Sequence, residues 1–417
     1  MKRVLLAVVV FLANWGSSAE GQGIVLSAAG PVNRSMGGAS VAAPIDSIGA
    51  IYWNPASISG MAQSEVAFGV DLLWANHSVS STAGPASGTT EGSAGSVPVP
   101  NLGWVHRIDD SILTLGLGVN AVAGFKTNLQ VDPTNPILAP PPIGLGRISS
   151  EAQFVQIAPV VSLAVTDQLS IAAGPTITTG QLTLEPFVLD SANPSGLYSS
   201  GRASRYHWGF GAQAGVYYVH NEDLRLGASL KSPTWMETFE YYGQDDAGAP
   251  RTLHADVDLP LILSVGTSYQ GIDDWLFAAD LRFFDYANTD GFGTANTFDG
   301  TRLNGLGWSS IFAAAFGAQR TVSESIDVRC GYTFNQNPVS EGRSFFATPA
   351  PLIYQHMVSA GATFQPHDDL SINLAYSFYP ETTRTGEIFL PSGPLAGTSV
   401  TNSLSVHMLS IGVTLRH

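Results

Sequence analysis

The strongest constraint on this chain is a pattern that occurs six times: a short acidic or polar turn, then residues that alternate between apolar and polar. In the fourth occurrence Asp273 and Asp274 precede a stretch in which Phe277, Leu281 and Phe283 alternate with polar or small residues. A period of two indicates a β-strand whose two faces meet different environments. The six turns lie at residues 109–111, 166–168, 221–223, 273–274, 323–325 and 367–369.

Each interval between these turns has room for two strands joined by a longer segment rich in Gly, Pro, Asn and Ser. Six short turns and seven long loops would connect fourteen strands, and twelve or sixteen strands remain open as alternatives. Short turns at one end and long loops at the other are typical of outer-membrane barrels, whose chain ends then lie on the periplasmic side. The expected loops lie near residues 81–97, 126–150, 186–203, 242–252, 289–305, 338–350 and 384–402.

Composition favours the same architecture. Charged residues make up only 12% of the chain, whereas hydrophobic residues make up 44%, so we expect much of the surface to face something other than water. After the N-terminus no run of eighteen apolar residues occurs, which argues against a transmembrane helix. A closed barrel is the other architecture that satisfies every backbone group in lipid. We therefore predict an all-β fold, a transmembrane antiparallel β-barrel.

The N-terminus has the features of a secretory signal. Lys2 and Arg3 precede a short apolar stretch at residues 4–13, and Ser17 and Ala19 are small residues at the positions before a cleavage site. An uncleaved anchor is the alternative, but ten apolar residues are too few to span a bilayer. We expect residues 1–19 to be removed, and the mature protein to lie in the outer membrane of a Gram-negative-type cell.

Charge and cysteine content exclude several classes of partner and cofactor. The formal net charge of −15 argues against nucleic acid as a partner. A single cysteine, Cys330, excludes an intramolecular disulfide and a cysteine-based metal cluster. We expect no cofactor and no metal, and we expect a monomer surrounded by outer-membrane lipids and detergent-like molecules.

Alternation also predicts which charged residues face the lumen. An Arg or Lys that faces lipid at the bilayer midplane costs about 2–4 kcal/mol, so charges opposite an apolar face should point inward. They could form a polar step on a ligand route, or they could pair with one another and with a plug. The residues are Arg225, Lys231, Asp280, Arg282, Asp327 and Arg329.

The segment that follows the signal sequence does not have the pattern of a strand. It contains Gly37-Gly38-Ala39, then Asp46, then the aromatic-Asn-Pro-Ala element Trp53-Asn54-Pro55-Ala56. This ordered set resembles the N-terminal hatch of the FadL/TodX family, outer-membrane transporters of long-chain fatty acids and aromatic hydrocarbons. The resemblance implies a hatch at residues 20–61 that plugs a barrel of about fourteen strands at residues 62–417. A flexible periplasmic arm is the alternative.

Local chemistry agrees with a plug. Gly37 and Gly38 allow close approach and free turning, and Pro55 prevents the segment from extending a sheet. The amide of Asn54 offers two donors and an acceptor, so we predict that it anchors the hatch beside Pro55 and Ala56 where ligand must pass.

Two features depart from the family pattern or match it loosely. The family usually continues Asn-Pro-Ala with Gly-Leu, whereas Ser57 and Ile58 follow here. In the family the third strand is kinked and opens a lateral exit into the membrane, so the resemblance implies the same here. The candidate residues for this kink are Gly116, Gly118, Asn120 and Gly124.

The function implied is passive, hatch-gated uptake of hydrophobic small molecules, either long-chain fatty acids or aromatic hydrocarbons. A fatty acid needs a cationic or hydrogen-bonding partner, whereas a toluene-like molecule needs only apolar walls. The apolar, proline-rich loop at residues 133–145 could form the mouth that captures substrate, or it could pack on its neighbours.

Two other functions are alternatives: a barrel enzyme that acts on lipid, and a structural or adhesive barrel. No Gly-x-Ser-x-Gly or His-Glu-x-x-His motif occurs, so we predict that the protein is not an enzyme.

Overall fold

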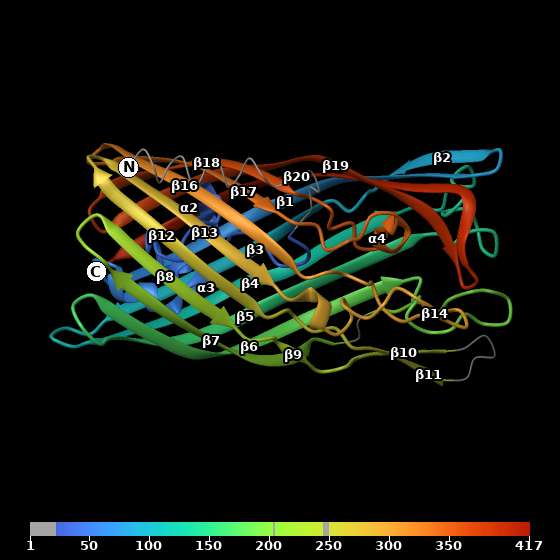
Figure 1. The fold of residues 1–417 in the computed structure, drawn as a ribbon, viewed down its shortest axis with the longest axis horizontal. Helices are drawn as coiled ribbons and strands as arrows, with labels where there is room; N and C mark the ends of the chain where they lie inside the picture. Colours follow the sequence, from blue (N-terminus) through green and yellow to red (C-terminus); the bar gives the residue numbers. More distant parts are fainter. Residues whose placement is uncertain (1–21, 203–204, 245–249) are drawn as a thin grey trace.

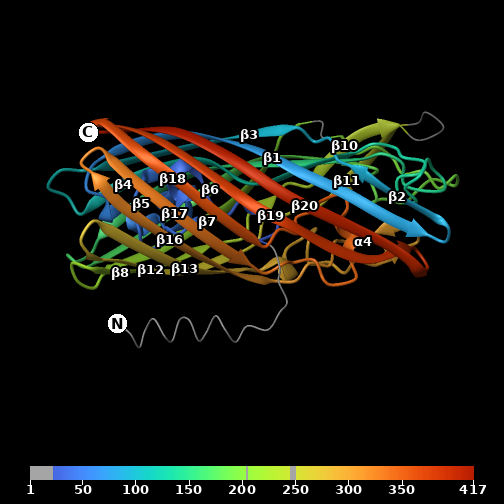
Figure 2. The same cartoon turned by 90° about the horizontal axis from the view of Figure 1, so that it is seen from above.

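The computed structural model describes residues 22–202, 205–244 and 250–417. The expected signal peptide at residues 1–19 lies outside the described residues. Fourteen antiparallel strands form a ring that closes where β1 pairs with both β20 and β3 (Figures 1 and 2). The predicted fourteen-stranded barrel is therefore confirmed.

The strands of the ring have the following bounds: β1 (Glu65–Ala83), β3 (Ser96–Arg107), β4 (Leu113–Leu129), β5 (Ile148–Ala164), β6 (Leu169–Glu185), β7 (His207–Val219), β8 (Leu224–Lys231), β12 (Ile262–Ile272), β13 (Trp275–Phe284), β16 (Ile311–Ser323), β17 (Ile326–Asn335), β18 (His356–His367), β19 (Leu370–Leu390) and β20 (Gly393–Arg416).

All six predicted turns join neighbouring strands at one end of the barrel. Asp110 and Asp274 adopt φ values of +54° and +64°, a left-handed conformation that Asp tolerates in tight turns. Glu65 pairs with Arg416, so the first and last strands begin and end at this same end. The six turns and the two ends of the barrel chain thus lie at one rim, which the sequence predicts to be the periplasmic one.

The opposite end carries longer connections that contain elements of their own. The expected loop at residues 384–402 is wrong, because β19 and β20 run on as a hairpin to the pair Leu390 and Gly393. This hairpin is rich in Thr, Ser and Gly, so its strands lack the regular apolar alternation of the others. The added elements are β2 (Ala86–Glu91), β9 (Trp235–Met236), β10 (Phe239–Gln244), β11 (Pro250–Ala255), η2 (Tyr286–Asn288), β14 (Phe298–Asp299), β15 (Arg302–Leu303) and α4 (Ser344–Ala347).

The outer face of the barrel is apolar and the inner face is polar. On β13 the exposed Phe277 and Leu281 alternate with the buried Asp280 and Arg282. The charged side chains of β13 therefore point away from the outer, apolar face. No helix among the described residues is long and apolar enough to cross a membrane.

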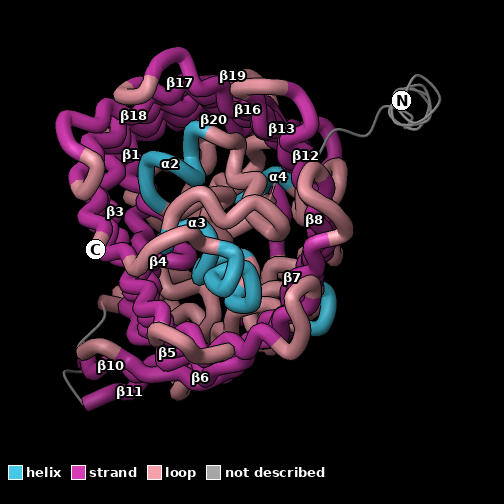
Figure 3. The backbone as a smooth tube through the Cα atoms, turned by 90° about the vertical axis from the view of Figure 1, so that its left-hand side faces the viewer, coloured by secondary structure: helices cyan, strands magenta, loops and turns pink. Residues whose placement is uncertain are grey.

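Residues 22–64 lie inside the ring of strands (Figure 3). They form α2 (Gly30–Ser35), α3 (Ser47–Trp53) and the 3-10 helix η1 (Pro55–Gly60). Every residue of α2 and α3 is buried. The first helix contacts β18 and β19, the second contacts β3 and β4, and η1 contacts β5, β6 and β7. A barrel of this width is not filled by its own side chains, and this segment occupies the space.

The two rims predict opposite accessibility on intact cells. We expect an epitope tag inserted at Gly300 to bind antibody from outside, because Gly300 is exposed in the turn between β14 and β15 and a Cβ there would have no neighbouring atom within 4 Å. A tag at Asp274, in a periplasmic turn, should bind only after the outer membrane is opened. Flow cytometry measures both, and the reverse labelling would contradict the orientation.

Candidate functional site

The wall of the barrel is interrupted between β3 and β4. Their ladder begins at Arg107 and Thr114 and ends at Asn101 and Asn120. Above this point β3 pairs only with β1, and β4 pairs only with β5. The two walls meet again where the Ser93 N–H donates to the Asn128 carbonyl at 2.8 Å. We call the interval between these two contacts the seam.

Two prolines in β3 border the seam. Pro98 and Pro100 have no N–H, and proline in a sheet is confined to edges and bulges for that reason. On the other side, the register of β4 shifts between Ala121 and Ala123, which is a bulge that bends the strand. Both strands are therefore built to leave their facing edges unpaired.

The predicted kink residues fall into two groups. Asn120 and Gly124 flank the bulge of β4, and a side chain at Gly124 would crowd the Ala152 carbonyl. Gly116 and Gly118 instead lie in the regular part of the ladder, where a Cβ on Gly118 would come within 2.8 Å of Ile51. Those two glycines make room for the segment in the lumen.

The N-terminal segment pairs with the free edge of β4. Val25 faces Ala123 in an antiparallel bridge. The Leu26 N–H donates to the Val122 carbonyl at 3.0 Å, and the Gly124 N–H donates to the Ile24 carbonyl at 3.2 Å. Residues 24–26 thus act as a short extra strand on the inner side of the seam.

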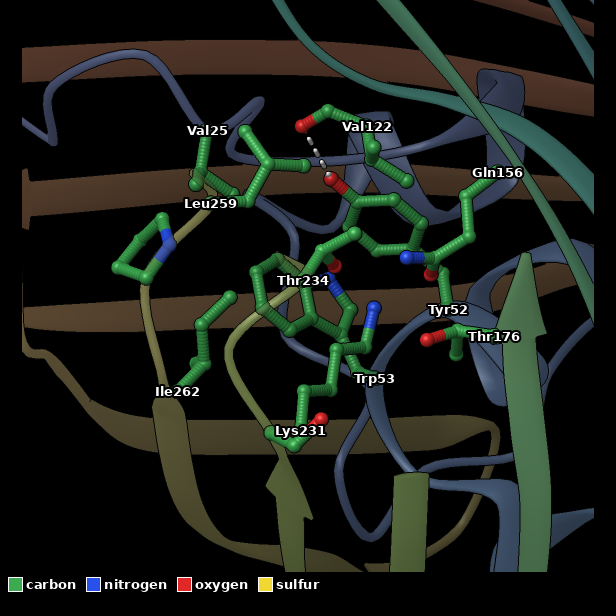
Figure 4. Close-up of a pocket in the computed structure, with 12 residues that line it drawn as sticks. Val25, Tyr52, Trp53, Val122, Gln156, Thr176, Lys231, Thr234, Leu259 and Ile262 are labelled. Carbon is green, nitrogen blue, oxygen red and sulfur yellow. Dashed lines mark hydrogen bonds between the residues drawn. The ribbon is translucent and has the colours of Figure 1, made fainter. Parts of the chain in front are cut away.

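This short strand separates two cavities. One lies in the seam and is lined by Leu26, Val99, Ala123 and Phe125 among others. The other lies in the lumen, with Val25 and Val122 on one side and Lys231 and Ile262 on the other (Figure 4). Residues of this short strand and of its partner strand β4 thus contribute to the lining of both cavities, and we call residues 24–26 the partition.

Asn54 ties the luminal segment to the wall. Its side-chain amide donates to the Val41 carbonyl at 2.7 Å and to the Val216 carbonyl of β7 at 3.0 Å. Its Oδ1 accepts from the Ala56 N–H at 3.1 Å, and Pro55 opens η1 directly after it. Gly215 is required beside it, because a Cβ there would collide with the Asn54 side chain.

Gly37 brings the backbone of the luminal segment close to the wall, and Gly38 brings it close to Ser27 of the same segment. Gly37 and Gly38 have φ values of +64° and +80°, which favour glycine. A Cβ on Gly37 would lie 2.7 Å from the Tyr332 nitrogen and 2.8 Å from the Phe316 carbonyl oxygen. Only glycine therefore satisfies both the conformation and the space.

Asp46 caps α3. Its Oδ1 accepts from the Gly49 N–H at 3.3 Å, the usual role of Asp at a helix N-terminus. Burial raises the pKa of this carboxyl to about 7, and the nearby Glu65 adds to the effect.

The predicted luminal charges all lie on the inner face, and most of them are paired. Arg282 and Asp280 form a buried ion pair at 2.7 Å. Asp280 also accepts from the Ser40 and Val41 N–H groups at 2.8 and 3.1 Å. The Arg282 guanidinium lies 3.4 Å above the centre of a Trp53 ring. These charges serve mainly to hold the luminal segment.

The other four charged residues also point inward, but they differ in how they are paired. Arg329 donates to Gln319 at 2.7 Å and to Thr363 at 2.6 Å, with Asp327 at 3.7 Å. Arg225 is half-buried on the inner face of β8, near the periplasmic rim. Lys231 ends the same strand and points into the luminal cavity.

Lys231 differs from the other luminal cations. Its Nζ lies 4.3 Å from the ring centre of Tyr52 and 5.7 Å from that of Trp53, and in the described ranges it has no carboxylate within 4.0 Å. Trp53 is fully buried, and its Nε1–H has no hydrogen-bond partner in the same part of the chain. The wall of the luminal cavity therefore presents hydrogen-bond donors that have no acceptor.

Sequence reasoning missed two features of this site. Arg34 and Asp71 form a buried ion pair at 2.7 Å, and Asn101 donates to the same carboxylate at 3.0 Å. Asp71 is an isolated charge in an alternating strand, so alternation could have placed it in the lumen. The alternating Val-Pro-Val-Pro of residues 97–100 was the signal for an unpaired strand edge.

The proline-rich loop is partly packed on its neighbours. Ile137 and Leu138 are buried in a cluster with Val79 and Leu129. The exposed apolar residues are Pro133, Pro140, Pro141, Pro142 and Ile143, the last at 84% exposed. Packing thus accounts for Ile137 and Leu138, and the exposed residues leave the interpretation as a mouth open.

Comparisons with known proteins agree with this architecture. A family model described as outer membrane protein transport protein (OMPP1/FadL/TodX) matches residues 10–411. Outer membrane protein P1 of Haemophilus influenzae is 23% identical over 308 residues, which cover 67% of this chain. The chain spans 65% of that relative's length in this match.

Three solved structures share the fold at low identity. The toluene transporter TodX of Pseudomonas putida gives a TM-score of 0.67 at 18% identity, covering 96% of this chain and 99% of TodX. A FadL homologue of Pseudomonas aeruginosa gives 0.69 at 15% identity, covering 94% and 99%. The toluene transporter TbuX of Ralstonia pickettii gives 0.65 at 18% identity, again covering 94% and 99%.

The anchor at Asn54 generates a prediction. Asn54→Ala removes the bonds to Val41 and Val216, and losing buried hydrogen bonds of this kind costs about 1–3 kcal/mol. We expect uptake of a fluorescent hydrophobic probe by cells to rise roughly tenfold, with the heat-modifiable barrel intact. Asn76→Ala, at an exposed position, is the matched control and should behave as wild type. Equal uptake in both variants would show that Asn54 is no anchor of a gate.

Proposed function

The chain belongs to the OMPP1/FadL/TodX family of outer-membrane transport proteins, and from that premise we propose that it takes up hydrophobic small molecules passively, with residues 20–61 as a hatch whose partition gates the route. TodX and TbuX are described as toluene transporters, which supports a hydrophobic substrate here. The proposed path runs from the extracellular mouth into the luminal cavity, past the partition, and out through the seam.

The observation that carries this proposal is the position of residues 24–26. They are the element that stands between the luminal cavity and the seam cavity. Two backbone hydrogen bonds attach them to β4, each worth about 0.5–1.5 kcal/mol net. A small displacement would therefore join the two cavities without disturbing the ladders of the barrel.

An exit through the seam suits an apolar solute. The seam cavity is lined largely by side chains such as Leu73, Val97 and Phe154, and it lies where the outer face of β4 changes from apolar residues to the exposed Lys126. A solute that leaves sideways passes from apolar side chains into lipid, so it does not have to enter water.

The luminal cavity favours a substrate with an acceptor group. Lys231 and Trp53 supply donors without acceptors, while Val25, Leu259 and Ile262 supply apolar contact. A buried donor left unpaired is costly, and a carboxylate would satisfy both donors at once. We propose that the substrate is an amphipathic acid, with its head group at Lys231.

A disulfide across the partition tests the gate. Val25 and Ala123 are a non-hydrogen-bonded pair, the arrangement in which facing side chains lie closest, so cysteines at both positions suit a disulfide. In a Cys330→Ser background we expect oxidation of Val25→Cys/Ala123→Cys to abolish uptake, and reduction to restore it. Each single cysteine variant is the control. Full uptake by the oxidised pair, with the disulfide verified by mass spectrometry, would refute the partition as a gate.

Lys231 tests the substrate class. We expect Lys231→Met to weaken binding of a fluorescent fatty acid by about tenfold or more, the value of a charge-assisted hydrogen bond. Binding of the methyl ester of the same acid should change little. Arg320→Met is the matched control, because Arg320 is an exposed cation on β16 that lines neither cavity. Equal loss for acid and ester would count against head-group recognition.

A further inference from the structure

We infer that two tyrosines of the extracellular loops, Tyr286 and Tyr354, are positioning residues that hold the partition closed. The inference rests on the proposed gate and adds the element that controls it. Tyr286 lies in η2, between β13 and β16. Tyr354 lies in the connection between β17 and β18. Both loops are far in sequence from the N-terminal segment that they contact.

The contacts are hydrogen bonds from hydroxyl groups to the main chain. The Tyr286 hydroxyl donates to the Gln22 carbonyl at 2.9 Å and accepts from the Val25 N–H at 3.3 Å. The Tyr354 hydroxyl donates to the Gly23 carbonyl at 2.9 Å. These bonds therefore fix the residues directly before the partition and the first part of the partition itself.

Two more tyrosines complete the set from other elements. The Tyr379 hydroxyl, on β19, lies 2.7 Å from the Ser27 hydroxyl. The Tyr52 hydroxyl, within the hatch, donates to the Leu26 carbonyl at 2.9 Å. The N-terminal segment is thus held on both sides of Val25, and the bonds before Val25 come from the extracellular loops.

The loop tyrosines are rigidly placed. The ring of Tyr286 packs edge-on against Phe292 and Trp308, with centroid distances of 5.6 and 5.2 Å. The ring of Tyr354 meets that of Tyr379 edge-on at 4.9 Å. Such aromatic pairs fix ring orientation, so each hydroxyl points at the N-terminal backbone for as long as its loop keeps this conformation.

The backbone of the segment is shaped to receive them. Gly23 has a φ of +71°, and a Cβ at this position would lie 2.6 Å from the Tyr286 hydroxyl oxygen. Gln22 is completely buried. Glycine is needed at position 23 for both its conformation and its contact with Tyr286. The N-terminal segment and the loops are therefore closely packed against each other.

This arrangement couples the cell exterior to the partition. A solute that settles among the loop aromatics would compete with the packing of Phe292 and Trp308 that orients Tyr286. Once the hydroxyl moves, the partition keeps its bonds to β4 and loses those to the loops. Binding at the loops and opening of the partition would then favour each other, as linkage requires.

Thiol labelling measures opening directly. Val25→Cys in a Cys330→Ser background places a thiol at a position that is 4% exposed. We expect Tyr286→Phe and Tyr354→Phe each to increase its labelling rate by a membrane-impermeant maleimide on intact cells by about two- to tenfold, the equilibrium effect of one such hydrogen bond. Both substitutions keep the ring and remove only the hydroxyl, so aromatic packing is retained.

Tyr241→Phe is the matched control. Tyr241 is a buried tyrosine of β10 whose hydroxyl has no hydrogen-bond partner among the described residues, so the same substitution should leave labelling unchanged. An equal increase in the control would attribute the effect to general loosening and overturn the inference. If one tyrosine variant does not form the heat-modifiable folded barrel, the labelling rate of the other variant tests the inference.

The result can be separated from failure of the gate itself. Deletion of residues 22–27 removes the partition whatever holds it. If the deletion changes uptake and neither tyrosine variant changes labelling, the gate stands and the tyrosine inference is wrong. If the deletion leaves uptake unchanged and the oxidised Val25–Ala123 pair still transports, the gate is refuted and the inference falls with it.

Discussion

The structure depends on one constraint: inside a membrane every backbone N–H and C=O must find a partner within the protein. Most contacts between neighbouring strands meet it with continuous or slightly irregular ladders. The β5–β6 ladder is broken between the pairs Ile157/Ile177 and Val161/Ala173 and then resumes, whereas the β3–β4 ladder stops at Asn101 and Asn120. The edge of β4 left free above that point is paired from inside by residues 24–26. The interruption in the wall therefore occurs together with a segment that supplies backbone partners to the edge left free.

The same constraint explains why the lumen is polar and yet firmly occupied. Charges excluded from the lipid face must lie inside, where leaving one partner unpaired would cost several kcal/mol. Asp280 and Arg282 meet this demand with each other and with the backbone of the hatch. Arg34 of the hatch does so with Asp71 of β1. The charged residues that a barrel cannot place outside thus become the points at which its hatch is attached.

The sequence predicts the fold correctly wherever apolar and polar residues alternate along a strand. It predicted the six turns, the fourteen strands and the inner face of Asp280 and Arg282, because lipid on one side and a polar lumen on the other impose a period of two. In the extension of β19 and β20 that contrast disappears, so the sequence predicts a loop where the structure has a polar hairpin. The seam was missed because Pro98 and Pro100 stand in an otherwise regular strand. The contacts of Tyr286 and Tyr354 with the N-terminal segment join residues more than 260 positions apart, and no local pattern records them.

The distribution of contacts decides which part of the hatch can move. The body of the hatch is held by a buried ion pair at Arg34, and breaking such a pair costs about 3–5 kcal/mol. It is also held by the Asn54 amide and by close backbone contact at Gly37. Residues 22–27 are held by single hydrogen bonds of about 0.5–1.5 kcal/mol each, shared among β4 and four tyrosines. Bonds of that size can be broken one at a time by thermal motion or by a ligand, whereas the ion pair cannot. The proposed opening therefore requires only the first few residues of the hatch to move, while its body stays in place and keeps the wide lumen closed to water.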